Sequence, residues 1–284
     1  MKIRLGLILL LCFSLGGCAS LVSSATSQVA DNVTLAILNQ NDPETVRDGA
    51  PAYLIMIDGL IEGDPENVRL LLSGAKLYGS YTAAFLIDDE ERARRLADKS
   101  LAYARRGICA QDDAVCEALG GRLDNFKEVL QTTNKSDLPA LYELAAAWSG
   151  WIRLNASDWN AIADVSRVTA LFEHCLVLDE TYDNGGSHVY LGVIKSFLPA
   201  TLGGKPEEGR QHFERAIEIS SGHNLMIRVL MAEHYARNIF DQELHDSLLN
   251  SVLEAEGEYP GFTLINALAK QQAEKLLAES EEFF

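Results

Sequence analysis

The chain has 284 residues, with 24 Lys and Arg against 41 Asp and Glu, so its formal net charge is −17. This acidity argues against nucleic acid as a partner and against electrostatic docking on anionic lipid, because both need a basic face. An apolar fraction of 48% with 23% charged residues is typical of a globular protein with a core. Seven prolines leave room for long helices.

The N-terminus predicts a secreted lipoprotein. Lys2 and Arg4 precede an apolar run, Leu5 to Leu15, that is too short to cross a bilayer. The following Leu15-Gly16-Gly17-Cys18 resembles the lipobox of bacterial lipoproteins, in which the cysteine is acylated after cleavage. We therefore expect residues 1–17 to be a signal peptide, and residues 18–28 to be a lipidated cysteine, carrying palmitate, with a short tether. Such lipoproteins use an Asp after the cysteine for inner-membrane retention, so Ala19 implies the periplasmic face of the outer membrane.

Three cysteines remain in the body of the protein. Cys109 and Cys116 flank an acidic loop, and an oxidising periplasm permits a disulfide between them. Free thiols are the alternative, whereas zinc is disfavoured because no CxxC pair or nearby histidine is present. Cys175 is expected to be a buried residue on a helix.

Residues 29–284 show helical periodicity and no sustained strand alternation. Apolar positions recur at spacings of three and four over 67–85 and again over 90–106. Capping or turn residues with early carboxylates predict helix starts near Asp64, Ser136, Ser157 and Lys205. Glycines predict helix ends at Gly107, Gly185-Gly186 and Gly203-Gly204. About a dozen helices with short connections are expected.

Internal similarity favours a helical-hairpin array over a simple bundle. The pattern G-x-P-E-x-x-R begins at Gly63 and again at Gly204, close to four periods of the roughly 34-residue tetratricopeptide repeat. Small, large and small residues follow that repeat's spacing at two sets of positions, Gly209, Phe213 and Ala216, and Ala97, Leu101 and Ala104. We therefore predict an all-α, tetratricopeptide-like α-solenoid that forms a single domain over 29–284.

The sequence contains none of the common catalytic motifs. The six histidines are scattered without an HExxH pair, and no P-loop, G-x-S-x-G or G-x-G-x-x-G pattern occurs. We expect no enzyme activity, no cofactor and no metal. Aromatic residues are the candidates for a ligand groove, since they either join helices in the core or line a concave surface; these are Tyr78, Tyr81, Tyr142, Trp148 and Trp151.

Several short motifs follow the lipobox in order along the chain: Gly49-Ala50-Pro51-Ala52-Tyr53, Asp58-Gly59-Leu60-Ile61-Glu62-Gly63-Asp64-Pro65, Tyr182-Asp183-Asn184-Gly185-Gly186, Leu202-Gly203-Gly204 and Leu264-Ile265-Asn266. Together with the lipobox, this ordered set resembles the T component associated with TRAP transporters, the TatT family. It covers nearly the whole mature chain. The stretch from Cys109 to Asn134 is the one departure.

The resemblance implies a periplasmic, non-catalytic accessory protein of a TRAP transporter. Family members are similar to one another in forming a homotrimer, with a channel through each subunit, and in docking a periplasmic substrate-binding protein. A hydrophobic ligand would fit the same arrangement. A tetratricopeptide scaffold lipoprotein for envelope assembly is the alternative function.

Overall fold

The computed structural model describes residues 33–197 and 204–284, and every regular element within these ranges is helical. The prediction of an all-α protein is therefore confirmed, while the tetratricopeptide type of the repeat stays a prediction. The predicted signal peptide, Cys18 and the tether of residues 18–28 lie outside the described residues.

Residues 43–154 form six helices, several of which begin at a residue whose side chain caps the first turn. Side chains of Asp42, Asn67 and Asp89 cap three of them by accepting backbone N–H groups of the first turn. The helices are α2 (Pro43–Gly63), α3 (Val68–Phe85), α4 (Glu90–Gln111), α5 (Asp113–Ala118), α6 (Leu123–Leu130) and α7 (Leu138–Leu154).

The part of the chain after α7 is also helical and contains one irregular helix. The segment α12 (Met226–Met231) runs directly into a π-helical turn, η3 (Ala232–Ala236). The other elements are α8 (Trp159–Ala163), α9 (Val165–Asp179), the 3₁₀ turn η1 (Tyr182–Asn184), α10 (Gly186–Ser196), α11 (Pro206–Ile219), α13 (Gln242–Glu254), α14 (Thr263–Ala278) and α15 (Ser280–Phe283).

Helices α3 and α4 form a tight antiparallel hairpin, and glycine makes its close crossing feasible. The sequence predicted that Gly107 would end α4, but this was wrong, because the helix continues to Gln111. A Cβ atom at Gly107 would lie 2.8 Å from Cδ2 of Leu72, so the residue serves helix packing instead. Gly209 plays the same part between α10 and α11, where a Cβ would lie 2.9 Å from the carbonyl oxygen of Gly192.

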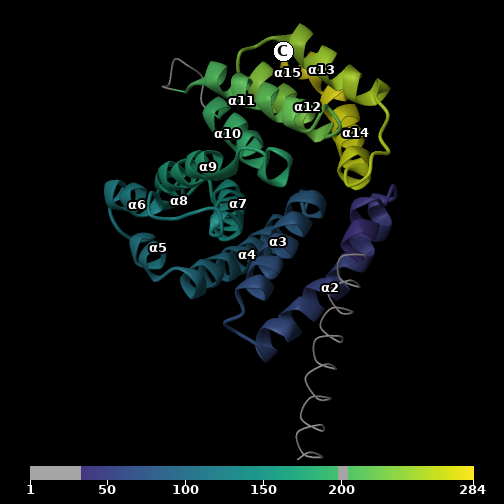
Figure 1. The fold of residues 1–284 in the computed structure, drawn as a ribbon. Helices are drawn as coiled ribbons and strands as arrows, with labels where there is room; N and C mark the ends of the chain where they lie inside the picture. The colour runs from purple at the N-terminus through teal and green to yellow at the C-terminus, as the bar shows by residue number, and fades with distance from the viewer. Residues whose placement is uncertain (1–32, 198–203) are drawn as a thin grey trace, which may run out of the picture.

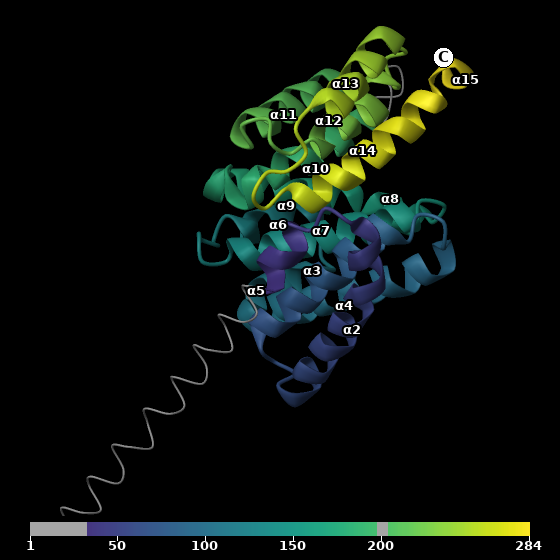
Figure 2. The same ribbon diagram turned by 90° about the vertical axis from the view of Figure 1, so that its right-hand side faces the viewer.

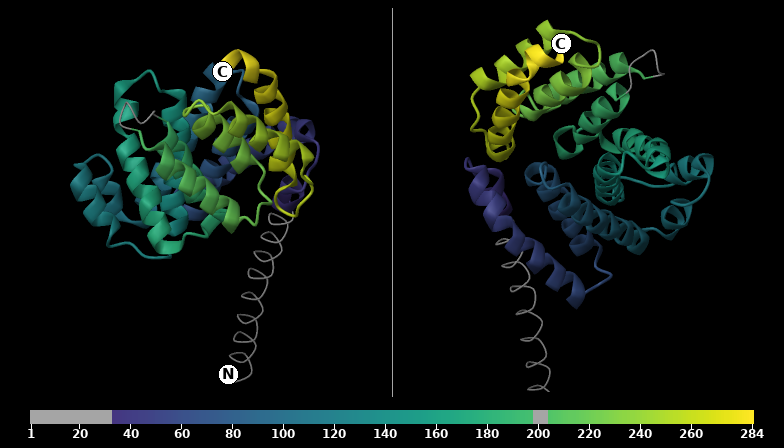
Figure 3. Two further views of the ribbon diagram at one scale, coloured as in Figure 1. Left: turned by 90° about the horizontal axis from the view of Figure 1, so that it is seen from above. Right: turned by 180° about the vertical axis from the view of Figure 1, so that it is seen from behind.

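Successive helices pack side by side, so that the chain returns to its starting point. Figure 2 shows α11–α14 stacked above α7, α9 and α10, which in turn stand above α2–α4. In Figures 1 and 3 the helices follow one another round a ring that brings α14 back to α2. The backbone N–H of Gly261 donates to Oδ1 of Asn39 at 2.7 Å, and Nδ2 of Asn41 donates to Oε1 of Glu258 at 3.1 Å. These contacts form a seam between the two ends of the array.

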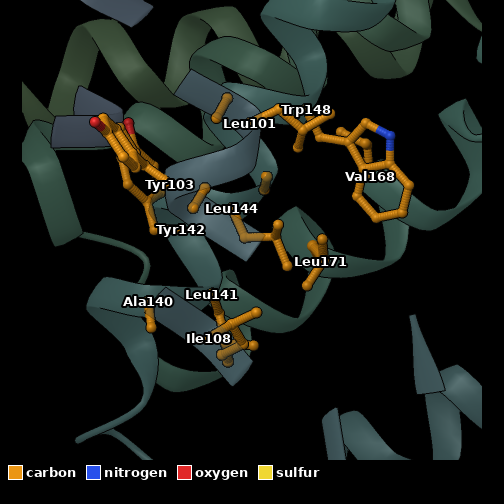
Figure 4. Close-up of a cluster of buried hydrophobic side chains, with 14 of the residues drawn as sticks. Leu101, Tyr103, Ile108, Ala140, Leu141, Tyr142, Leu144, Trp148, Val168 and Leu171 are labelled. Carbon is orange, nitrogen blue, oxygen red and sulfur yellow. The ribbon is translucent and has the colours of Figure 1, made fainter. Parts of the chain in front are cut away.

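The main hydrophobic core runs from α2 to α10, and two smaller clusters serve α10–α14. Figure 4 shows part of it, with Leu141, Leu144 and Trp148 of α7 among side chains of α4 and α9. The stretch after Cys109, which the resemblance left unplaced, joins this core through Phe126 and Leu130, which are 0% and 1% exposed.

Candidate functional site

The five candidate aromatic residues do not meet at one place. Tyr78 and Tyr81 lie on α3, and Tyr142, Trp148 and Trp151 lie on α7. All but Trp151 are buried, with exposed fractions of 6% or less. The surroundings of each residue therefore decide what it can do.

Tyr142 reaches a cluster of charged groups contributed by three elements. Its hydroxyl donates to Oδ2 of Asp183 at 2.7 Å. The Nζ atom of Lys76 lies 3.4 Å from Oδ1 of Asp183 and 3.7 Å from Oε1 of Glu143. Residues more than one hundred positions apart in the chain thus converge, and we call Lys76, Tyr142, Glu143 and Asp183 the polar cluster.

A left-handed turn places Asp183 in the polar cluster. Asp183, Asn184 and Gly185 all have positive φ angles, of 50°, 56° and 82°. Asp and Asn tolerate this conformation better than other residues, because their short side chains bond locally, and glycine adopts it freely. The turn also lets α10 begin at Gly186.

Glu143 is the most perturbed carboxyl group of the cluster. The residue is only 8% exposed, and burial raises its pKa to about 7, with Lys76 opposing this effect and Asp183 adding to it. At neutral pH this carboxyl group can therefore hold or release a proton. Around it, the hydroxyls of Tyr182 and Tyr190 have no hydrogen-bond partner among residues 33–197 and 204–284. Burial also raises the pKa of both tyrosines.

Tyr78 belongs to a second network, which joins three helices. The Asp58 carboxylate on α2 accepts hydrogen bonds from the hydroxyls of Tyr78 at 2.8 Å and Tyr103 at 2.7 Å, and from Nζ of Lys99 at 2.5 Å. Burial alone would raise the pKa of Asp58, but the bonds from Lys99 and the two tyrosines bring it below the ordinary value. Tyr78 lies on α3, and Lys99 and Tyr103 lie on α4. The network therefore holds α2 against both helices.

The two tryptophans have different surroundings. Trp148 is 2% exposed, with the guanidinium of Arg105 4.9 Å from its ring centroid and no hydrogen-bond partner for Nε1 within the described chain. Trp151 is half-buried, and its Nε1 donates to Oδ1 of Asp98 at 2.7 Å. Trp148 is a core residue, whereas Trp151 ties α7 to α4.

Cys109 and Cys116 are joined in a disulfide, with Cα atoms 4.7 Å apart. The bond links the end of α4 to α5. Cys175 is a free, buried thiol whose pKa burial raises to about 12, so it is inert toward thiolate chemistry at neutral pH.

Two histidines that lie far apart in the sequence meet between α10 and α11. Nδ1 of His188 lies 2.8 Å from Nδ1 of His212, and the other ring nitrogen of His188 faces Glu180 at 3.3 Å. Burial lowers the pKa of His212 to about 4, and the neighbouring His188 adds to the effect. No group of three His, Cys, Asp or Glu residues suited to a metal ion occurs in the described ranges.

Comparison with known families decides which protein class this arrangement belongs to. The pattern of the TRAP transporter T-component matches residues 39–284, which include every helix named above. The chain belongs to the TRAP transporter T-component family. No curated protein matches it.

Family membership supports an accessory role for this T component in a TRAP transporter, and such components are not a known enzyme class. None of its helices in the described ranges has the length and hydrophobicity of a membrane span. Sequence reasoning identified Tyr142 but missed Lys76 and Glu143, which carry no motif. The turn at Asp183 was visible as the Tyr-Asp-Asn-Gly-Gly motif, although its contacts were not.

Proposed function

We propose that this T component is a non-catalytic lipoprotein that binds the periplasmic substrate-binding protein of a TRAP-type transport system. Cys18 would carry the lipid anchor, holding the helical array on the periplasmic face of the outer membrane. The proposal includes a homotrimer and a hydrophobic ligand. The observation that carries it is the family match over residues 39–284.

An exposed face of α2 is suited to docking the substrate-binding protein. Ile55, Met56 and Leu60 on this face are 72%, 53% and 48% exposed. Asp48 and Glu62 flank them along the same helix. Apolar anchors inside a polar rim are the usual source of binding energy, and the acidic rim selects a partner with a basic patch.

Replacing one of these anchors tests the docking face. We expect Ile55→Asp to weaken binding of the substrate-binding protein at least ten-fold, because it places an unpaired charge at the centre of the contact. Val177 on α9 is a matched control, since it is 76% exposed and lies on another helix. Equal affinities for Ile55→Asp and Val177→Asp would show that the partner binds elsewhere.

Co-purification from native membranes tests the function as a whole. The full chain and a Cys18→Ser variant would be expressed with the substrate-binding protein that is encoded beside the TRAP membrane subunits. We expect labelled palmitate and outer-membrane fractionation for the wild type, with the substrate-binding protein retained after mild cross-linking. The variant should lose the label but keep the partner. Absence of the partner from both samples would refute the transporter role, and an unlabelled wild type would refute the anchor.

A further inference from the structure

A pocket of about 340 Å³ opens where α2, the end of α3 and the start of α4 meet. This volume lies in the range of about 300–1,000 Å³ that is usual for small-molecule sites. The pocket is lined by Arg47, Asp48, Pro51, Tyr81, Phe85, Leu86 and Arg92. It is separate from the polar cluster, none of whose residues lines it.

The inner wall of the pocket is apolar and aromatic. Tyr81 and Leu86 are 6% and 5% exposed, and the rings of Tyr81 and Phe85 lie 5.6 Å apart at an angle of 48°. The Tyr81 hydroxyl donates to the carbonyl oxygen of Arg47 at 3.4 Å, which directs its polar end toward α2. The wall is therefore suited to the apolar part of a ligand.

The positive charge at the pocket comes from two arginines with different surroundings. Arg47 already pairs with Glu44 and with Asp48, at 3.2 Å and 3.1 Å. The guanidinium of Arg92 lies 5.6 Å from the Tyr81 ring centroid and forms no ion pair with any residue of the described ranges. Arg92 is thus free to bind an anion, although the protein as a whole carries a charge of −17.

We propose that this pocket binds a monocarboxylate with an apolar, ring-sized tail. The planar guanidinium of Arg92 can donate two parallel hydrogen bonds to a carboxylate, while the tail packs on Tyr81 and Phe85. Asp48 stands at the same pocket and repels a second negative charge, so a dianion binds more weakly.

A longer tail also has space. A neighbouring hollow of about 240 Å³ shares Arg47 and Phe85 with the pocket and extends to Leu268 and Gln271 of α14. The inference rests on the ligand-binding part of the proposed function. Docking of the substrate-binding protein is measured separately, so the two can fail independently.

The test is calorimetric titration of the protein from residue 19 onward, which keeps every described residue. The probes are 4-phenylbutyrate, the neutral 4-phenylbutanol and the dianion phenylsuccinate. We expect saturable binding of 4-phenylbutyrate, with affinity at least about ten-fold above that of either other probe, since a hydrogen-bonded ion pair contributes about this factor.

Two variants assign the binding to Arg92. Arg92→Gln should lower the affinity for 4-phenylbutyrate about ten-fold, and Arg92→Lys should lower it less. The control is Arg95→Gln on the same helix, since Arg95 pairs with Glu91 and does not line the pocket. Circular dichroism would establish that each variant is folded. No saturable binding, or equal affinities for Arg92→Gln and Arg95→Gln, would overturn the proposal.

Discussion

At the scale of single residues, two carboxyl groups of this T component have opposite environments. Asp58 is ionised and receives three hydrogen bonds from α3 and α4. Glu143 is buried with a single cation, Lys76, at 3.7 Å, and its pKa rises to about 7. The first carboxylate stabilises the fold through its charge, whereas the second stabilises it best when protonated.

Replacing Asp58 should destabilise the protein substantially. Asp58→Ala leaves the Tyr103 hydroxyl without its acceptor and Lys99 without its ion pair, and it leaves the Tyr78 hydroxyl only the Leu54 carbonyl oxygen at 3.5 Å. We expect a loss of about 2 kcal/mol in the free energy of unfolding, measured with urea. Glu62→Gln is the control, because Glu62 is exposed on the same helix, and it should change stability by less than about 0.5 kcal/mol. Equal effects of the two substitutions would argue against the network.

Glu143 predicts a pH dependence of stability with a definite sign. Its pKa rises from 4.5 to about 7 on folding, so its stabilising contribution is complete below pH 4.5 and is lost as the pH rises through 7. Between about pH 5 and about pH 8, wild type should lose about 2 kcal/mol of stability relative to Glu143→Gln. Urea unfolding at both pH values measures this. A pH-independent difference between the two proteins would contradict the burial of an ionisable Glu143.

At the scale of helices, the crossing of α10 and α11 depends on the absence of a side chain. A Cβ at Gly209 would lie 2.2 Å from Oγ of Ser196 and 2.9 Å from the backbone of Gly192. Gly150 on α7 is also helical, but nothing lies within 4 Å of its added Cβ. Alanine substitutions therefore test helix packing at Gly209 and helix propensity alone at Gly150.

Gly209→Ala should destabilise the protein, whereas Gly150→Ala should not. We expect a loss of about 1–3 kcal/mol for Gly209→Ala, because the helices must move apart. Gly150→Ala should gain up to about 1 kcal/mol from helix propensity. Thermal unfolding with calorimetric enthalpies measures both changes. If Gly209→Ala also stabilised the protein, the crossing of α10 and α11 would be looser than the Cβ distances indicate.

Local sequence signals predicted helices of this protein but not the contacts between them. The apolar period over 67–85 predicted α3 almost to the residue, since this signal is local, whereas the predicted start near Asp64 lies before the actual N-cap, Asn67. The prediction of a helix end at Gly107 was wrong, because the sequence does not distinguish a glycine that ends a helix from one that allows a neighbouring helix to pack closely. The pairing of Lys76 with Asp183 spans 107 positions, and no local pattern carries it. The polar cluster therefore had to be found in the structure.

At the scale of the whole molecule, the seam between Asn39 and Gly261 holds the first and last parts of the array together. Few contacts cross it compared with the core, so it should open locally before the protein unfolds. Asn39→Ala should speed hydrogen exchange at residues 258–262 at least several-fold, with the free energy of global unfolding changed by less than about 1 kcal/mol. Asn250→Ala, on the exposed side of α13, is the control. Unchanged exchange at 258–262 would show that other contacts hold the seam.

We propose that this acidic helical array binds the substrate-binding protein of its TRAP system. The most direct measurement is calorimetric titration of the chain from residue 19 onward with that protein, at low and at moderate salt. We predict saturable binding that weakens as salt increases. The chain from residue 19 onward lacks Lys2 and Arg4, so it has 22 Lys and Arg against 41 Asp and Glu, and its net charge of −19 selects a basic partner. No heat and no co-elution, with both proteins folded, would contradict this binding and favour a scaffold for envelope assembly.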